Sequence, residues 1–135
     1  MKSAIALFGL MTMTATSALA GDRLVAGEYE ITSVIDGKPT TSRYCATPEM
    51  AKGTNGDEAS DREYVQNAAK TCKIETFTVA GNTIDYSMNC SGVTTKIHAV
   101  YHGDHFEGEM TRERDGKTFI THTTAKRVGE CTADK

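Results

Sequence analysis

CKIETFTVAGNTIDYSMNC, residues 72–90, decides the fold, because polar and apolar residues alternate on both sides of a glycine turn. This alternation is typical of β-strands with one buried face, and a hairpin of two such strands places apolar residues opposite one another. A three-residue loop at 80–82 meets this condition and predicts the pairs Ile74–Met88, Thr76–Tyr86 and Thr78–Ile84.

The same register sets Cys72 directly opposite Cys90, so it predicts a disulfide between them. A two-residue loop would put Ile74 opposite Asn89 and would leave polar residues on the core face. The core pattern and the crosslink therefore favour the same three-residue loop.

Two further hairpins are expected toward the C-terminus. Gly103-Asp104 is a glycine-first pair suited to a type II′ turn, and Asp115-Gly116 is a strong type I′ signal. The pairs that these turns predict are Tyr101–Phe106, Ala99–Gly108, Ile97–Met110, Phe119–Arg112 and Thr121–Met110. They all share one inner face with the hairpin at 72–90.

Nearer the N-terminus, residues 28–35 and 40–45 alternate around Asp36-Gly37, which predicts one more hairpin. The fold class is therefore mainly β, a seven-stranded antiparallel meander that curls into a small barrel-like sheet. We expect one or two short helices after the second strand, closing one opening or edge.

Two segments carry helix-start signals. Thr47-Pro48-Glu49 combines an N-cap, a proline at the first helical position and an acid in the first turn. Ser60-Asp61-Arg62-Glu63 has the form of a capping box and predicts a second helix that runs to about Lys70.

The inner face is large and aromatic. Its predicted members are Tyr29, Ile31, Tyr86, Met88, Ile97, Tyr101, Phe106, Met110 and Phe119. Either they fill the barrel, which is the default, or some of them line a pocket for a small apolar ligand, in which case the ligand-binding residues are Tyr29, Tyr86, Met88, Tyr101, Phe106, Met110 and Phe119.

Residues 1–20 read as a signal peptide, with Lys2 before an apolar run and Ala18-Leu19-Ala20 as the cleavage site. The expected mature protein is a single disulfide-stabilised domain, residues 21–135, in the periplasm. The apolar run is too short to span a bilayer and Gly21 stands where a lipoprotein has cysteine, so we expect no membrane insertion and no lipid anchor.

The four cysteines predict a disulfide framework in an oxidising compartment. With Cys72 and Cys90 paired, Cys45 and Cys131 remain and should bond to each other. The competing interpretation is a cysteine metal site, although the sequence contains no Cys-x-x-Cys.

Composition narrows the function classes. The formal net charge is −3 and no basic cluster is present, which argues against nucleic acid and anionic lipid as partners. No motif in the sequence requires a cofactor. Oligomeric state is left open.

All four histidines fall on the predicted outer face. His102 and His105 flank the Gly103-Asp104 turn as a cross-strand pair, and His98, Glu109 and His122 form a row across three strands. The simplest interpretation is a solvated polar face. The alternative is a metal site, which two neighbours can share but three members of a convex row reach only with strain.

Catalysis has little support. There is no Gly-x-Ser-x-Gly, and Glu107 and Glu109 point outward along one strand beside histidines, where acids usually serve solubility. We therefore predict that the protein is not an enzyme.

Several short motifs recur together along the mature chain. They are GEYE at 27–30, RYCATPE at 43–49, CKI at 72–74, GNT at 81–83, CSG at 90–92 and RVGEC at 127–131. In this combination the chain resembles the bacterial family of domain of unknown function 3617. The resemblance implies a small exported protein with a four-cysteine framework, and it carries no activity. Two departures stand out, since Tyr29 replaces the commoner Trp and the first hairpin's insert is reduced to residues 36–39.

Three functions follow as hypotheses. The first is a non-catalytic periplasmic domain that binds a small apolar ligand. The second is an inhibitor-like or chaperone-like module that binds a periplasmic protein, and the third is a metal-handling protein that uses the histidine face.

Overall fold

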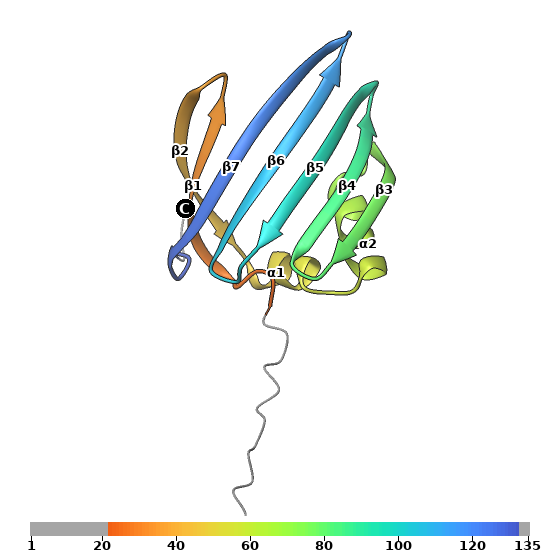
Figure 1. Cartoon of the computed structure of the whole chain (residues 1–135). Helices are drawn as coiled ribbons and strands as arrows, with labels where there is room; N and C mark the ends of the chain where they lie inside the picture. Colours follow the sequence, from red (N-terminus) through yellow and green to blue (C-terminus); the bar gives the residue numbers. More distant parts are fainter. Residues whose placement is uncertain (1–21, 133–135) are drawn as a thin grey trace, which may run out of the picture.

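A computed structural model of the chain describes residues 22–132, and its seven strands form one antiparallel sheet (Figure 1). The strands are β1 (Gly27–Ile35), β2 (Lys38–Ala46), β3 (Cys72–Ala80), β4 (Thr83–Cys90), β5 (Val93–Tyr101), β6 (His105–Arg114) and β7 (Lys117–Gly129). Their order in the sheet is β2-β1-β7-β6-β5-β4-β3, so the predicted meander is confirmed and β7 returns to pair with β1.

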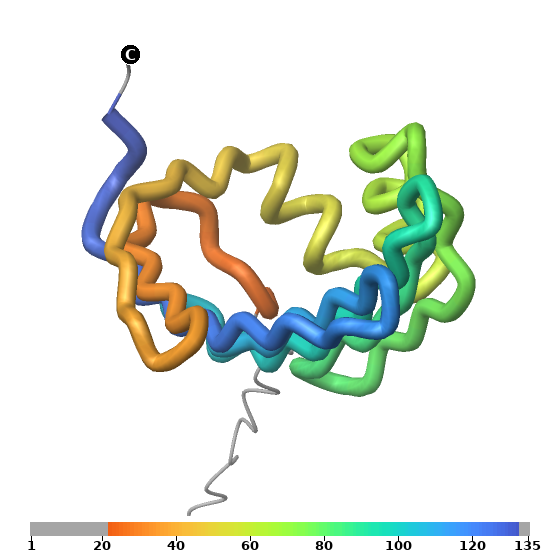
Figure 2. The backbone as a smooth tube through the Cα atoms, turned by 90° about the horizontal axis from the view of Figure 1, so that it is seen from above, coloured from red at the N-terminus to blue at the C-terminus, as the bar shows by residue number. Residues whose placement is uncertain are grey.

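The sheet curls but stays open, because its edge strands β2 and β3 do not pair with each other. The chain crosses from one edge to the other through α1 (Pro48–Thr54) and α2 (Glu58–Ala68). Seen from above, these helices run across the opening of the curved sheet (Figure 2). They therefore partly close the concave side, as expected for an insert after the second strand.

The predicted turns form through residues that tolerate left-handed backbone. Asp36-Gly37 has φ values of 51° and 74°, and Asp115-Gly116 has the same pair of values, as type I′ turns require. Gly103 has a φ of 86°, which fits the predicted type II′ turn. The predicted pairs Ile97–Met110 and Tyr101–Phe106 between β5 and β6, and the predicted pairs between β6 and β7, are confirmed.

The register of β3 against β4 is partly wrong in the prediction. Cys72 pairs with Cys90 and Ile74 with Met88 as expected, but the ladder shifts between Ile74 and Thr76. Thr76 therefore pairs with Ser87 instead of Tyr86, and the hairpin closes with a two-residue turn.

Packing explains this β-bulge. The shift brings Phe77 opposite Tyr86 and Val79 opposite Ile84, in place of the predicted pair of Thr78 with Ile84. Phe77 becomes buried and stacks on Tyr86 with ring centroids 5.3 Å apart. One extra residue in the strand thus keeps both the disulfide and an apolar inner face.

Both helices form, with one shifted start. Thr47 caps α1 as predicted and accepts a hydrogen bond from the Met50 amide at 3.2 Å. In α2 the N-cap is Asp57 instead of Ser60, because the Asp57 carboxylate accepts the Ser60 amide at 2.8 Å. Asp61, a member of the predicted capping box, is instead buried.

The core fills one end of the concave side and continues along its β3 edge, where buried Ile74 pairs with Met88. We call the filled end the closed end, and it contains the Gly103 turn, α1 and residues 22–26, while the turns at 36–37, 91–92 and 115–116 form the open end. One core cluster consists of Leu24, Tyr29, Ala46 and Ala125, and the other of Ile74, Phe77 and Ile84. Tyr101 packs against both clusters and joins them.

Candidate functional site

A groove lies on the concave side at the open end. It has a volume of about 500 Å³ and is lined by Ile35, Met88, Cys90, Val93, Thr95, Arg112, Arg114, Phe119 and Thr121. Five strands contribute to the lining, which makes the groove a feature of the whole sheet. Its volume falls within the range of about 300–1,000 Å³ that is common for small-molecule sites.

The groove exists because the core fills the closed end and the β3 edge, and leaves the open end uncovered between β1 and β6. Tyr29 is fully buried at the closed end, and its hydroxyl donates to the Val25 carbonyl at 2.6 Å. At the open end Phe119 remains 50% exposed and Ile35 48% exposed. The default expectation that the inner face is filled is therefore wrong for this end of the sheet.

The structure separates the seven predicted ligand-binding residues into two groups. Met88 and Phe119 line the groove. The other five, Tyr29, Tyr86, Tyr101, Phe106 and Met110, do not line it, and the first four of them belong to or pack against the core clusters. Burial raises the pKa of Tyr101 to about 12, as expected for a phenol removed from water.

Arg112 and Arg114 also line the groove, although neither was among the predicted ligand-binding residues. Arg112 pairs with Phe119 across the β6–β7 ladder, and Arg114 pairs with Lys117. The signal was present in the sequence, because the predicted register already placed Arg112 beside inward-facing Phe119. Arg114 contacts Asp115 in an exposed pair at 3.7 Å, and within residues 22–132 no carboxylate forms an ion pair with Arg112.

Each disulfide fastens one edge strand of the sheet. Cys72–Cys90 links the edge strand β3 to β4 beside the groove, and Cys45–Cys131 links the edge strand β2 to the segment after β7. Both predicted connections are therefore confirmed, and within residues 22–132 no cysteine is free for metal binding.

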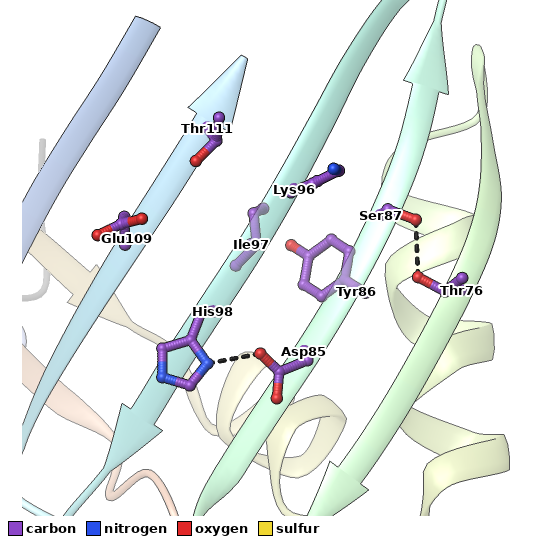
Figure 3. A pocket seen from close by; sticks show the side chains of 9 residues that line it. All are labelled: Thr76, Asp85, Tyr86, Ser87, Lys96, Ile97, His98, Glu109 and Thr111. Atoms are coloured by element: carbon purple, nitrogen blue, oxygen red, sulfur yellow. Dashed lines mark hydrogen bonds and ion pairs between the residues drawn. The ribbon is translucent and has the colours of Figure 1, made fainter. Parts of the chain in front are cut away.

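The histidine face is on the convex side, where each histidine lies near a carboxylate. The predicted row is in register, since Glu109 pairs with His98 on one side and His122 on the other. His98 nevertheless contacts Asp85 at 2.5 Å from Nδ1 to Oδ1, away from Glu109 (Figure 3). Glu109 contacts His122 at 3.4 Å. The row is thus divided between two separate pairs.

His102 and His105 do come together, with stacked rings whose centroids are 4.6 Å apart. His105 also contacts Asp104 at 2.7 Å, and this hydrogen bond lowers the pKa of the Asp104 carboxyl. Within the described part of the chain, no group of three or more histidine, cysteine, aspartate or glutamate residues is arranged to hold a metal ion. The histidine face therefore provides two neighbouring histidines, His102 and His105, as its candidate metal ligands.

We expect this pair to bind Zn²⁺ only weakly at neutral pH, because stable zinc sites use three or four protein ligands. Isothermal titration should show weak binding that His102→Ala abolishes. Submicromolar affinity that disappears in His98→Ala or His122→Ala would contradict this prediction.

The fold and its crosslinks define a class, a small disulfide-bonded domain built on one open, curled antiparallel sheet. Two disulfides are typical of an oxidising, exported environment. The chain belongs to the family described as protein of unknown function (DUF3617), whose model matches residues 24–131. No curated protein and no solved structure matches it significantly.

Neither helix in residues 22–132 has the length and apolar character needed to cross a membrane. The predicted signal peptide, residues 1–20, lies outside the described residues.

Proposed function

We propose that the protein is a non-catalytic periplasmic binding domain that holds a small apolar ligand in the groove at the open end. One observation carries the proposal. Phe119 and Ile35 stand half exposed on the wall of a concavity of about 500 Å³, while Tyr29 and Leu24 at the closed end are buried. Full burial of an exposed side chain of this size contributes about 1.5–3 kcal/mol, so an apolar occupant that covers a half-exposed one gains about half of this free energy.

The shape of the groove favours a small molecule over a protein partner. Concave, mostly apolar sites with a few polar groups are typical of small-molecule binding. The backbone around this groove is held by ladder hydrogen bonds between adjacent strands and by the Cys72–Cys90 disulfide at its edge. A preformed wall of this kind lowers the entropy lost when a ligand binds.

The chemistry of the lining supports binding without catalysis. The groove contains two threonines, two arginines and a disulfide-bonded cysteine, and its lining includes no histidine or carboxylate to activate a hydroxyl. The histidines and the acids that pair with them on the sheet lie on the convex face, where they are solvent exposed.

A matched pair of variants tests the proposal. Phe119 is 50% exposed on the concave side, and its neighbour Ile120 is 46% exposed on the convex side. Wild-type protein should bind the neutral fluorescent probe N-phenylnaphthylamine saturably. Phe119→Ser should weaken this binding about tenfold or more, because a buried aromatic contact is worth more than 1.4 kcal/mol, and Ile120→Ser should leave it unchanged.

The result that contradicts the proposal is equally direct. Equal losses of probe binding in both variants would indicate nonspecific adsorption, and no saturable binding by the wild type would remove the proposed ligand site.

A further inference from the structure

Part of the groove lining is positively charged, because it includes Arg112 and Arg114. Arg112 lies between Thr95 on β5 and Phe119 on β7, in the middle of the sheet and on its concave side. A charged residue at such a position breaks the alternation that would otherwise place an apolar side chain there. Positions that break a local rule without a structural partner tend to be functional.

Basic residues extend from Arg112 along the open end. Register partners share one face of a sheet, so Lys117 shares the concave side with Arg114, and Lys38 shares it with Ile35. We name Lys38, Arg112, Arg114 and Lys117 the basic rim. The chain as a whole carries a net charge of −3, so this rim is a local reversal of the overall charge, and the expectation that no basic cluster is present is wrong for this end of the sheet.

Acidic groups do little to neutralise the rim. Glu113, between the two arginines in sequence, pairs with Thr94 and so faces the convex side. Asp36 and Asp115 occupy the turns, and the contact of Asp115 with Arg114 is a 3.7 Å pair with side chains 88% and 71% exposed. Exposed pairs of this kind are weak and leave the arginine available to a ligand.

We propose that the ligand of the groove is an anionic amphiphile, a single apolar chain that ends in a carboxylate. The proposal rests on the proposed function and names its ligand class. The apolar chain lies against Phe119, Val93 and Met88, and the carboxylate is bound by Arg112 and Arg114. A guanidinium suits this role because its fork of N–H donors matches the two oxygens of a carboxylate.

The charge state of the partners sets the expected discrimination. Arginine stays protonated throughout the accessible pH range, and a fatty-acid carboxylate is ionised at neutral pH. A charge-assisted hydrogen bond contributes roughly as much as a tenfold change in affinity or more. An uncharged alcohol of the same chain length gains only the free energy from its apolar contacts with the groove.

The experiment compares decanoate with decanol as displacers of N-phenylnaphthylamine from three proteins. Wild type should bind decanoate at least tenfold more tightly than decanol. The Arg112→Met/Arg114→Met double variant keeps comparable side-chain volume, so it should lose this preference and retain decanol binding. Lys96→Met removes an exposed cation from the convex side and should behave as wild type.

Ionic strength gives a second readout that needs no variant. Added NaCl should weaken decanoate binding to the wild type and leave decanol binding unchanged, because salt screens exposed charges. Equal affinities of the wild type for decanoate and decanol, or a preference that survives in the double variant, would overturn the inference while leaving the apolar groove in place. Failure of the wild type to bind any of the three compounds overturns the proposed function and this inference together.

Discussion

Replacement of Asp61 by alanine should lower the free energy of unfolding by about 3–5 kcal/mol, because it leaves a largely buried guanidinium without its counter-charge. The Asp61 side chain is 1% exposed and contacts Arg23 at 2.9 Å, while the Arg23 side chain is 13% exposed. Removing one partner of such a pair costs far more than the pair itself contributes, since the remaining charge stays desolvated.

The Arg23–Asp61 pair also connects several segments of the closed end, which adds to its effect on stability. Arg23 also donates to the carbonyls of Thr54 at 2.8 Å and Gly81 at 3.2 Å, and Asp61 accepts the Gly56 amide at 2.9 Å. These bonds tie the segment before β1 to the connection between the helices and to the β3–β4 turn. Burial raises the pKa of the Asp61 carboxyl, against the opposing hydrogen bonds from Gly56 and Arg23.

Urea unfolding followed by circular dichroism measures the effect, with Glu63→Ala as the matched control. Glu63 is an exposed acid on the same helix, so its loss should change stability by no more than about 0.5 kcal/mol. The Arg23→Met/Asp61→Leu double variant should lose less stability than the sum of the losses in Arg23→Met and Asp61→Leu, because no unpaired buried charge remains. Similar changes for Asp61→Ala and Glu63→Ala would show that the pair does not stabilise the closed end.

Local chemistry explains why much of the fold could be predicted from the sequence. An Asp-Gly pair favours left-handed backbone at both positions, so the turns at 36–37 and 115–116 follow from the residues themselves. Once those turns are fixed, strand pairing follows by counting along the chain, and the pairing of Cys72 with Cys90 adds an independent check on register.

The errors arose where the local pattern is ambiguous. The bulge before Thr76 allows Phe77 to pack against Tyr86, and the sequence carries a signal for it, because Ile74 and Phe77 are three positions apart and share one face only when a residue is inserted between them. The N-cap of α2 lies three residues before the predicted Ser60, because the Asp57 carboxylate accepts the Ser60 amide.

In the candidate site, local and distant causes can be separated. The inward faces of Phe119 and Arg112 follow from the register of one hairpin. Whether that face is filled depends on which end of the concave side α1 and residues 22–26 cover. They cover the closed end, where Leu24 forms a bridge with Gly103, so the groove at the open end could not be predicted from strand patterns.

Loss of the Cys45–Cys131 disulfide should lower the free energy of unfolding by about 2–5 kcal/mol, and by more than loss of Cys72–Cys90. The two bonds close loops of very different length, with sequence separations of 86 and 18. In the chain-entropy model this difference gives the longer loop about 1.4 kcal/mol more stabilisation, because the longer cross-link removes more freedom from the unfolded chain.

The native structure points in the same direction. The edge strand β2 pairs only with β1, and Cys131 follows β7 on the other side of β1, so the bond clamps three adjacent strands at the closed end. Thermal and urea unfolding of Cys45→Ser/Cys131→Ser and Cys72→Ser/Cys90→Ser measure both losses without leaving a free thiol. If the shorter loop proves the more stabilising one, native packing around the β3–β4 hairpin outweighs loop entropy, and the curl of the sheet is held chiefly from its β3 edge.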